Sequence, residues 1–195
     1  MLPAFKRLGI GVLAGAISGF VVGGLGGRLF MFVLAQLNPE ETGVKTDDGF
    51  EIGQFTLSGT LNLFAFTTIL GIIGGLVFLG VRGLRFGPVW FRVLSMPIGV
   101  TIVLGPLLIH SDGADFSLLE PAELAVAMTL AVPFLYTLLL AWLVDRRLGD
   151  EPGFWQAMPS VVPWLARAAF AALIIVALVS LVSTVDDILH PFQFD

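Results

Sequence analysis

The chain has no cysteine and few charged residues among its 195. The absence of cysteine excludes disulfides, thiolate catalysis, iron–sulfur clusters and cysteine-based zinc sites. Only 13% of the residues are charged, whereas soluble globular domains have about 25%. Together with a mean hydropathy of +0.94, this composition indicates a membrane protein.

Charged groups are also absent from the middle of every long apolar stretch. No Asp, Glu, Lys or His lies there, although proton-coupled transport requires a protonatable group within the membrane. The sequence has no P-loop, GxSxG or HExxH motif. The single tyrosine, Tyr136, lies within an apolar stretch, where we expect its hydroxyl to bond a neighbouring helix. These absences favour a non-catalytic protein, and we predict no cofactor.

Five apolar stretches approach the length of about 20 residues that a spanning helix requires. We therefore predict an all-α integral membrane protein in which residues 1–195 form one polytopic domain. The predicted transmembrane helices are residues 8–37, 59–81, 93–109, 123–144 and 162–185. The first stretch follows Lys6 and Arg7, as in a signal peptide, but it exceeds the usual apolar region of about 7–15 residues. We therefore expect that this helix is not cleaved as a signal peptide.

The basic residues sort to one side when the five spans are threaded through a bilayer. The other side receives only Lys45, and Arg28 lies within the first stretch. Short loops rich in Lys and Arg stay in the cytoplasm, so we predict an inside N-terminus, an outside C-terminus and a prokaryotic plasma (inner) membrane. The residues on the basic side are Lys6, Arg7, Arg82, Arg85, Arg92, Arg146, Arg147 and Arg167.

Nucleic acid is not an expected partner of this chain. Its formal net charge is −5, whereas nucleic-acid binding requires a basic footprint. The acidic residues map mainly to the predicted outer side. They predict a negative outer face that raises the local concentration of cations.

Glycines recur at every fourth position of the first predicted helix. Residues four apart share a helix face, and glycine there lets a second backbone approach closely. The row predicts tight packing of the first helix against the second, as an antiparallel hairpin within one chain. Packing against another copy or another subunit is the alternative, and a glycine-lined pore is a further one. The packing candidates are Gly11, Gly15, Gly19, Gly23 and Gly27 in the first helix and Gly71, Gly74 and Gly75 in the second.

The longest outer loop, residues 38–58, contains a turn signal. Asp48-Gly49 lies between short segments rich in β-forming residues, which is typical of a hairpin. We predict a small extracytoplasmic β-hairpin with Phe50, Ile52 and Phe55 on its buried or membrane-facing side. A disordered acidic loop is the alternative.

Arg28 is the one charge inside an apolar run. An arginine at mid-membrane costs at least about 2.5–3.5 kcal/mol on insertion scales, so we expect a partner. Glu120, Glu123 and Asp186 are the candidates at helix ends, besides two aspartates of the 38–58 loop. The group is interpreted as a structural ion pair, and the alternative is a site for a lipid headgroup or a substrate anion.

The two histidines provide weak candidates for a metal site. His110, Asp112 and His190 all map to the predicted outer side, and histidine and carboxylate groups bind zinc. Their spacing matches no known metal-binding motif, so the presence of a metal remains open.

The abundance of packing surface and the lack of chemical groups favour a non-catalytic function. We predict an accessory, assembly or stabilising subunit that packs against other membrane components, or against itself, through the glycine-rich helix. A second hypothesis is a small channel or facilitator for cations or a neutral solute, suggested by prolines at 97, 106 and 133. Its polar candidates are Asn62, Thr67, Thr68, Thr101 and Thr137. A third hypothesis is a lipid-binding or lipid-modifying protein that uses Arg28.

Overall fold

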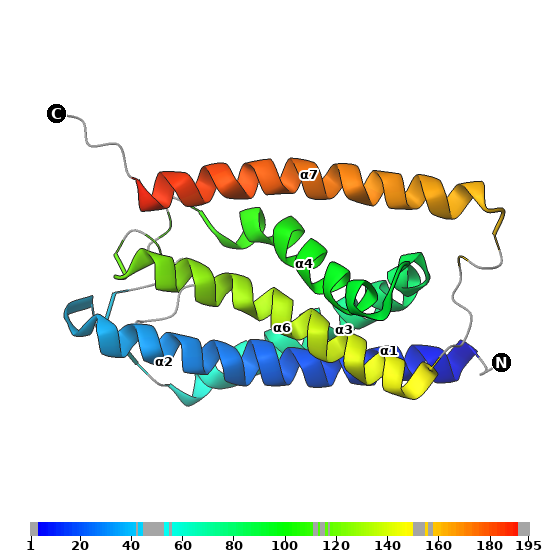
Figure 1. Ribbon diagram of the computed structural model, residues 1–195. Helices are drawn as coiled ribbons and strands as arrows, with labels where there is room; N and C mark the ends of the chain where they lie inside the picture. The colour runs from blue at the N-terminus through cyan, green and yellow to red at the C-terminus, as the bar shows by residue number, and fades with distance from the viewer. Residues whose placement is uncertain are drawn as a thin grey trace.

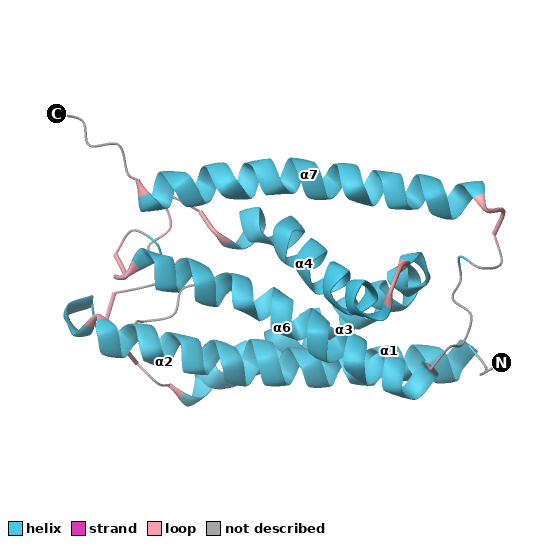
Figure 2. Ribbon diagram, viewed as in Figure 1, coloured by secondary structure: helices cyan, strands magenta, loops and turns pink. Residues whose placement is uncertain are grey.

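The computed structural model describes nine segments of the chain, and the structural statements that follow concern these residues. They are residues 4–41, 43–44, 53–54, 56–110, 113, 116, 118–149, 155 and 158–190. This part of the chain is helical and contains no strand (Figure 2).

Five helices of this structure are long and apolar enough to cross a membrane, so the chain is a multi-pass membrane protein. The first comprises three consecutive segments, the second continues into a short 3-10 turn, and the other three are single helices. The segments are α1 (Ala4–Ser18), η1 (Gly19–Gly26), α2 (Gly27–Leu37), η2 (Pro39–Glu41), α3 (Leu57–Val81), η3 (Arg82–Leu84), α4 (Val89–Leu108), α6 (Ala122–Leu148) and α7 (Val161–Leu189).

The helices extend further than predicted at the ends that carry arginine. α1 begins at Ala4, α4 at Val89, and α6 continues to Leu148. The added turns contain the charged residues that flank each apolar stretch. Helical hydrogen bonding continues past the hydrocarbon core into the interface, where charged side chains are solvated, so hydropathy underestimates helix length.

The long helices pack in the order α3, α1, α6, α4 and α7 (Figure 1). α1 and η1 lie on α3, α6 lies between α1 and α4, and α7 packs mainly on α4. The N-terminal end of α1, the α3–α4 connection and the end of α6 lie at one end of the bundle. We call this end, which holds Arg82, Arg85, Asp145 and Arg167, the arginine end.

The first spanning helix changes its winding at the centre. Residues Gly19–Gly26 form a π-helix between α1 and α2, and the amide of Gly27 bonds the carbonyls of both Gly23 and Gly24. Glycine tolerates the wider turn because it has no side chain to crowd the backbone. The glycine row therefore does not follow ideal α-helical spacing beyond Ser18.

Two groups of buried side chains form the core. One lies near the arginine end, where Phe78 of α3 packs with Leu140 and Val144 of α6 and Ala14 of α1. The other lies toward the opposite end and is built from Leu34, Ala35, Ile109, Phe116, Leu119, Ala125, Val126 and Leu181. Both cores contain residues of the first spanning helix and of α6; the core near the arginine end also includes α3, and the other also includes α7.

The predicted hairpin in residues 38–58 falls largely outside the described residues. Phe50, Ile52 and Phe55 are among the residues that are not described. The described residues of this loop include the 3-10 turn Pro39–Glu41. Thr56 then caps α3, because its hydroxyl accepts a hydrogen bond of 3.2 Å from the amide of Gly59.

Candidate functional site

The glycine row of the first helix lies against α3 of the same chain. A methyl group added at Gly15 would overlap the carbonyl oxygen of Gly71 and lie 3.1 Å from the Cα of Gly75. A methyl group added at Gly71 would lie 2.8 Å from the Cα of Gly19. We call this backbone contact, formed by Gly11, Gly15, Gly19, Gly71 and Gly75, the glycine crossing.

The remaining glycines of the predicted set differ in their surroundings. A Cβ at Gly23 would lie 2.8 Å from the Cβ of Thr67, whereas one at Gly27 would make an ordinary contact of 3.7 Å with Leu63. Gly74 lies against the hydroxyl of Tyr136. Residues of α3 thus cover the glycine row from Gly11 to Gly23.

Tyr136 fixes a third helix to the glycine crossing. Its hydroxyl donates a hydrogen bond of 2.7 Å to the carbonyl oxygen of Gly71, which confirms the expected bond to a neighbouring helix. A small residue at position 74 leaves room for the phenol ring. α1, α3 and α6 therefore meet at one point in the interior of the bundle.

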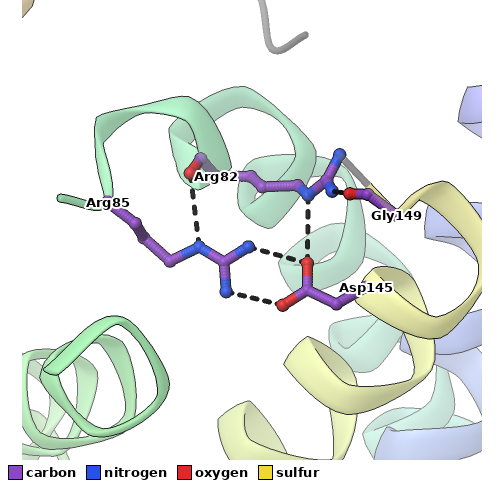
Figure 3. Close-up of polar contacts among 4 residues, drawn as sticks. All are labelled: Arg82, Arg85, Asp145 and Gly149. Carbon is purple, nitrogen blue, oxygen red and sulfur yellow. Dashed lines mark hydrogen bonds and ion pairs between the residues drawn. The ribbon is translucent and has the colours of Figure 1, made fainter. Parts of the chain in front are cut away.

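The arginine end contains a partly buried ion-pair cluster (Figure 3). Arg85 donates from both terminal nitrogens to the two carboxylate oxygens of Asp145, at 2.8 and 2.7 Å. The Nε of Arg82 lies 3.1 Å from Asp145 Oδ1, and its Nη2 donates to the carbonyl oxygen of Gly149. The side chains of both arginines are only 11% exposed.

The sequence interpretation assigned these arginines to one side of the membrane but not to a common partner. Asp145 stands next to Arg146 and Arg147 in the sequence, but residues one or two apart on a helix do not face each other. The helix instead directs Asp145 toward η3, and the arginine adjacent to it, Arg146, lies over the Trp142 ring at 5.3 Å. The cluster joins the end of α3 to the end of α6.

Arg167 is held at the same end by different contacts. Its Nε donates a hydrogen bond of 3.0 Å to the carbonyl oxygen of Leu84 in η3. Its guanidinium carbon lies 5.1 Å from the centroid of the Phe86 ring and 5.3 Å from that of Trp164. These contacts connect α7 to the α3–α4 connection.

The residues of the candidate group around Arg28 take part in different contacts within the described part of the chain. The guanidinium of Arg28 does have partners, including the sulfur of Met31 at 4.0 Å. The backbone amide of Glu120 is bonded by Asn38 Oδ1 at 2.8 Å, and Asp186 lies 3.0 Å from His190. Glu123 lies in the first turn of α6.

The candidate metal ligands are separated into smaller sets. Asp186 Oδ1 contacts His190 Nδ1 one turn along α7, and both side chains are more than 70% exposed. Asp112 lies outside the described residues. Within the residues that the structure describes, no three His, Asp or Glu side chains are grouped so that they could hold a metal ion.

Comparisons with protein-family models, with curated proteins and with solved structures found no match for this chain. Its function must therefore be inferred from the contacts of its own residues.

Proposed function

We propose that the chain is a non-catalytic, multi-span membrane protein that serves as an accessory, assembly or stabilising subunit for other membrane components. The observation that carries this proposal is the exposure of α7. Only Ala177 and Leu181 are buried among its 29 residues. A helix of this length with so little cover within its own chain has a large surface for another membrane protein or a second copy.

The glycine row is not the partner surface in this proposal, although the sequence favoured it. α3 occupies the row from Gly11 to Gly23, so a partner helix would have to displace a spanning helix of the same chain. α7 has small residues on its exposed surface, and small residues at helix surfaces support close contacts in lipid. They are Ala168, Ala169, Ala171, Ala172, Ser180 and Ser183.

The use of polar groups within the spans supports a structural function. Tyr136 bonds α6 to α3. The hydroxyls of Thr67 and Thr101 donate to carbonyl oxygens of their own helices, each at 2.8 Å. Groups that already have partners inside the bundle are poorly available for substrates.

We further propose that the arginine end faces the cytoplasm of a prokaryotic cell and that the protein resides in the plasma membrane. The clustering of Arg82, Arg85 and Arg167 at one end of the bundle supports this orientation. Short loops that are rich in arginine are retained on the cytoplasmic side during insertion.

Mild-detergent purification followed by size-exclusion chromatography with light scattering tests the accessory function. We expect recovery as an oligomer or with a copurifying membrane protein. Ala172→Phe on the exposed surface of α7 should weaken this association. Ala65→Phe on an exposed position of α3 is the matched control and should leave it intact. Recovery of the unmodified protein only as a monomer contradicts the proposal.

A channel and a lipid-modifying protein remain alternatives that fewer observations favour. The hydrogen bonds of Thr67 and Thr101 reduce the number of free hydroxyls for a wet path. Solute flux into liposomes that depends on the protein would favour the channel. Loss of lipid binding in a folded Arg28→Ala variant would favour the third hypothesis.

A further inference from the structure

Arg167 differs from Arg82 and Arg85 at the arginine end, because no carboxylate of the described residues is paired with it. Arg82 and Arg85 share Asp145. Arg167 is bonded through Nε to the Leu84 carbonyl, a neutral acceptor. Both terminal nitrogens of Arg167 lack an acceptor among the described residues. The charge is thus fixed in place, while four N–H donors remain available.

The position of Arg167 corresponds to a membrane boundary. α7 has 29 residues and is about 43 Å long, which exceeds a hydrocarbon core of about 30 Å. Arg167 lies six residues after Val161, about 9 Å along the axis. Helical side chains lean toward the N-terminus of their helix, so the guanidinium extends toward the headgroups at this end.

Aromatic rings surround the guanidinium on its own side of the bundle. Phe86 and Trp164 lie within cation–π distance of Arg167. Phe86 also contacts Phe91, which in turn contacts Trp90. Trp90 and Trp164 are 66% and 65% exposed, and tryptophan is favoured where hydrocarbon meets headgroups.

We propose that Arg167 binds the phosphate of an anionic phospholipid at the contact between α7 and the α3–α4 connection. The two terminal nitrogens of a guanidinium match two phosphate oxygens, and basic pockets between spanning helices on the cytoplasmic side bind anionic headgroups. The Leu84 carbonyl and the two rings fix the plane of the guanidinium before the lipid arrives. The acyl chains lie along exposed apolar side chains of α4 and α7, including Val93 and Leu173.

Arg146 provides a matched control at the same end of the bundle. It also lies over a tryptophan, Trp142, at 5.3 Å, and both residues are exposed. It has neither the second ring nor the backbone anchor that fix Arg167. General attraction between a basic surface and anionic lipid would depend on the two arginines equally, whereas the proposed site depends on Arg167 alone.

Native mass spectrometry of the full chain in detergent, with added phosphatidylglycerol or phosphatidylcholine, tests the proposal. We expect phosphatidylglycerol to bind about fivefold more tightly, because both lipids offer the same phosphate oxygens but the choline ammonium offsets the negative charge that the guanidinium meets. Arg167→Gln should abolish this preference, and Arg146→Gln should retain it. Equal affinity for the two lipids, or equal losses in the two variants, would overturn the proposal.

Two further measurements are controls. One tests whether a loss of binding reflects misfolding, and the other tests whether the headgroup binds without its acyl chains. Arg167→Lys keeps the charge and can be used if Arg167→Gln does not fold. We expect this variant to bind phosphatidylglycerol more weakly than the unmodified protein, because lysine lacks the planar fork that contacts two phosphate oxygens. An unchanged affinity for phosphatidylglycerol in this variant would overturn the fixed-guanidinium site. Glycerol 3-phosphate should bind much more weakly than the lipid, and equally tight binding would overturn the assignment to a phospholipid.

Discussion

Tyr136 of α6 donates a hydrogen bond of 2.7 Å to the carbonyl oxygen of Gly71 in α3. Gly71 also packs against the backbone of Gly15 and Gly19 in the first spanning helix. Two spanning helices therefore contact one residue of a third, and that residue has no side chain. Gly71 is consequently a position at which added volume would disturb the packing of the bundle.

Gly71→Ala should destabilise the protein by about 1–3 kcal/mol or more, because the new methyl group overpacks a contact between two backbones. Gly80→Ala in the same helix is the control, since nothing lies within 4 Å of a Cβ at that position. Thermal unfolding in detergent should show a lower midpoint for the first variant and an unchanged midpoint for the second. Equal midpoints would contradict the glycine crossing.

Tyr136→Phe should cost about 0.6 kcal/mol, the average for interhelical hydrogen bonds in membrane proteins. The ring remains in place against Gly74, so only the hydroxyl is lost. Thr184→Val is a suitable comparison, because that hydroxyl bonds the carbonyl of Ser180 in its own helix. Unfolding by increasing fractions of denaturing detergent measures both variants, and a smaller loss in Tyr136→Phe than in Thr184→Val would count against the interhelical bond.

Arg85→Gln and Asp145→Asn should each destabilise the protein, and the double variant should lose less than the sum of the two. The Asp145 side chain is 38% exposed, so solvent weakens the pair and we expect a coupling of about 1 kcal/mol rather than that of a fully buried pair. A double-mutant cycle of unfolding free energies measures this coupling. Arg147→Gln on the exposed side of the same helix end should change stability little, and additive losses in the cycle would exclude the ion pair.

Single cysteines should report the orientation of the bundle, because the natural chain has none. Glu40→Cys and Arg147→Cys place a thiol at exposed positions on opposite ends. With the arginine end in the cytoplasm, an impermeant maleimide should label the first variant in intact cells and the second only after lysis. The reverse pattern would invert the orientation, and labelling of both in intact cells would contradict the arrangement of spans.

Hydropathy was sufficient to predict five spanning helices because lipid imposes a length and an apolar composition on each of them. The helix ends were less accurate. Lys6 and Arg147 lie inside α1 and α6, whereas the predicted helices included only the apolar stretches and did not reach these residues. Charged residues reduce hydropathy without ending a helix, since the interface solvates their side chains while backbone hydrogen bonding continues.

The spacing of glycines likewise indicated a surface for close packing, and the glycines of the second helix made that helix the preferred partner. The row taken alone is also compatible with a second copy or another protein. Gly71 and Gly75 now identify α3 as the helix in contact. The choice required tertiary structure because a glycine has no side chain whose shape or polarity could specify a partner.

The sequence by itself determined that the protein lies in lipid, that it has five spanning helices, and that its basic residues fall mainly at one side of them. Each of these follows from composition along a single chain. Only the tertiary structure brought Asp145 to Arg82 and Arg85 and placed the Arg167 guanidinium between Phe86 and Trp164. Those contacts join residues about 60 or more positions apart or depend on how one helix is rotated against the next. Rotation and pairing are set by the packing of all five helices together, which no local pattern contains.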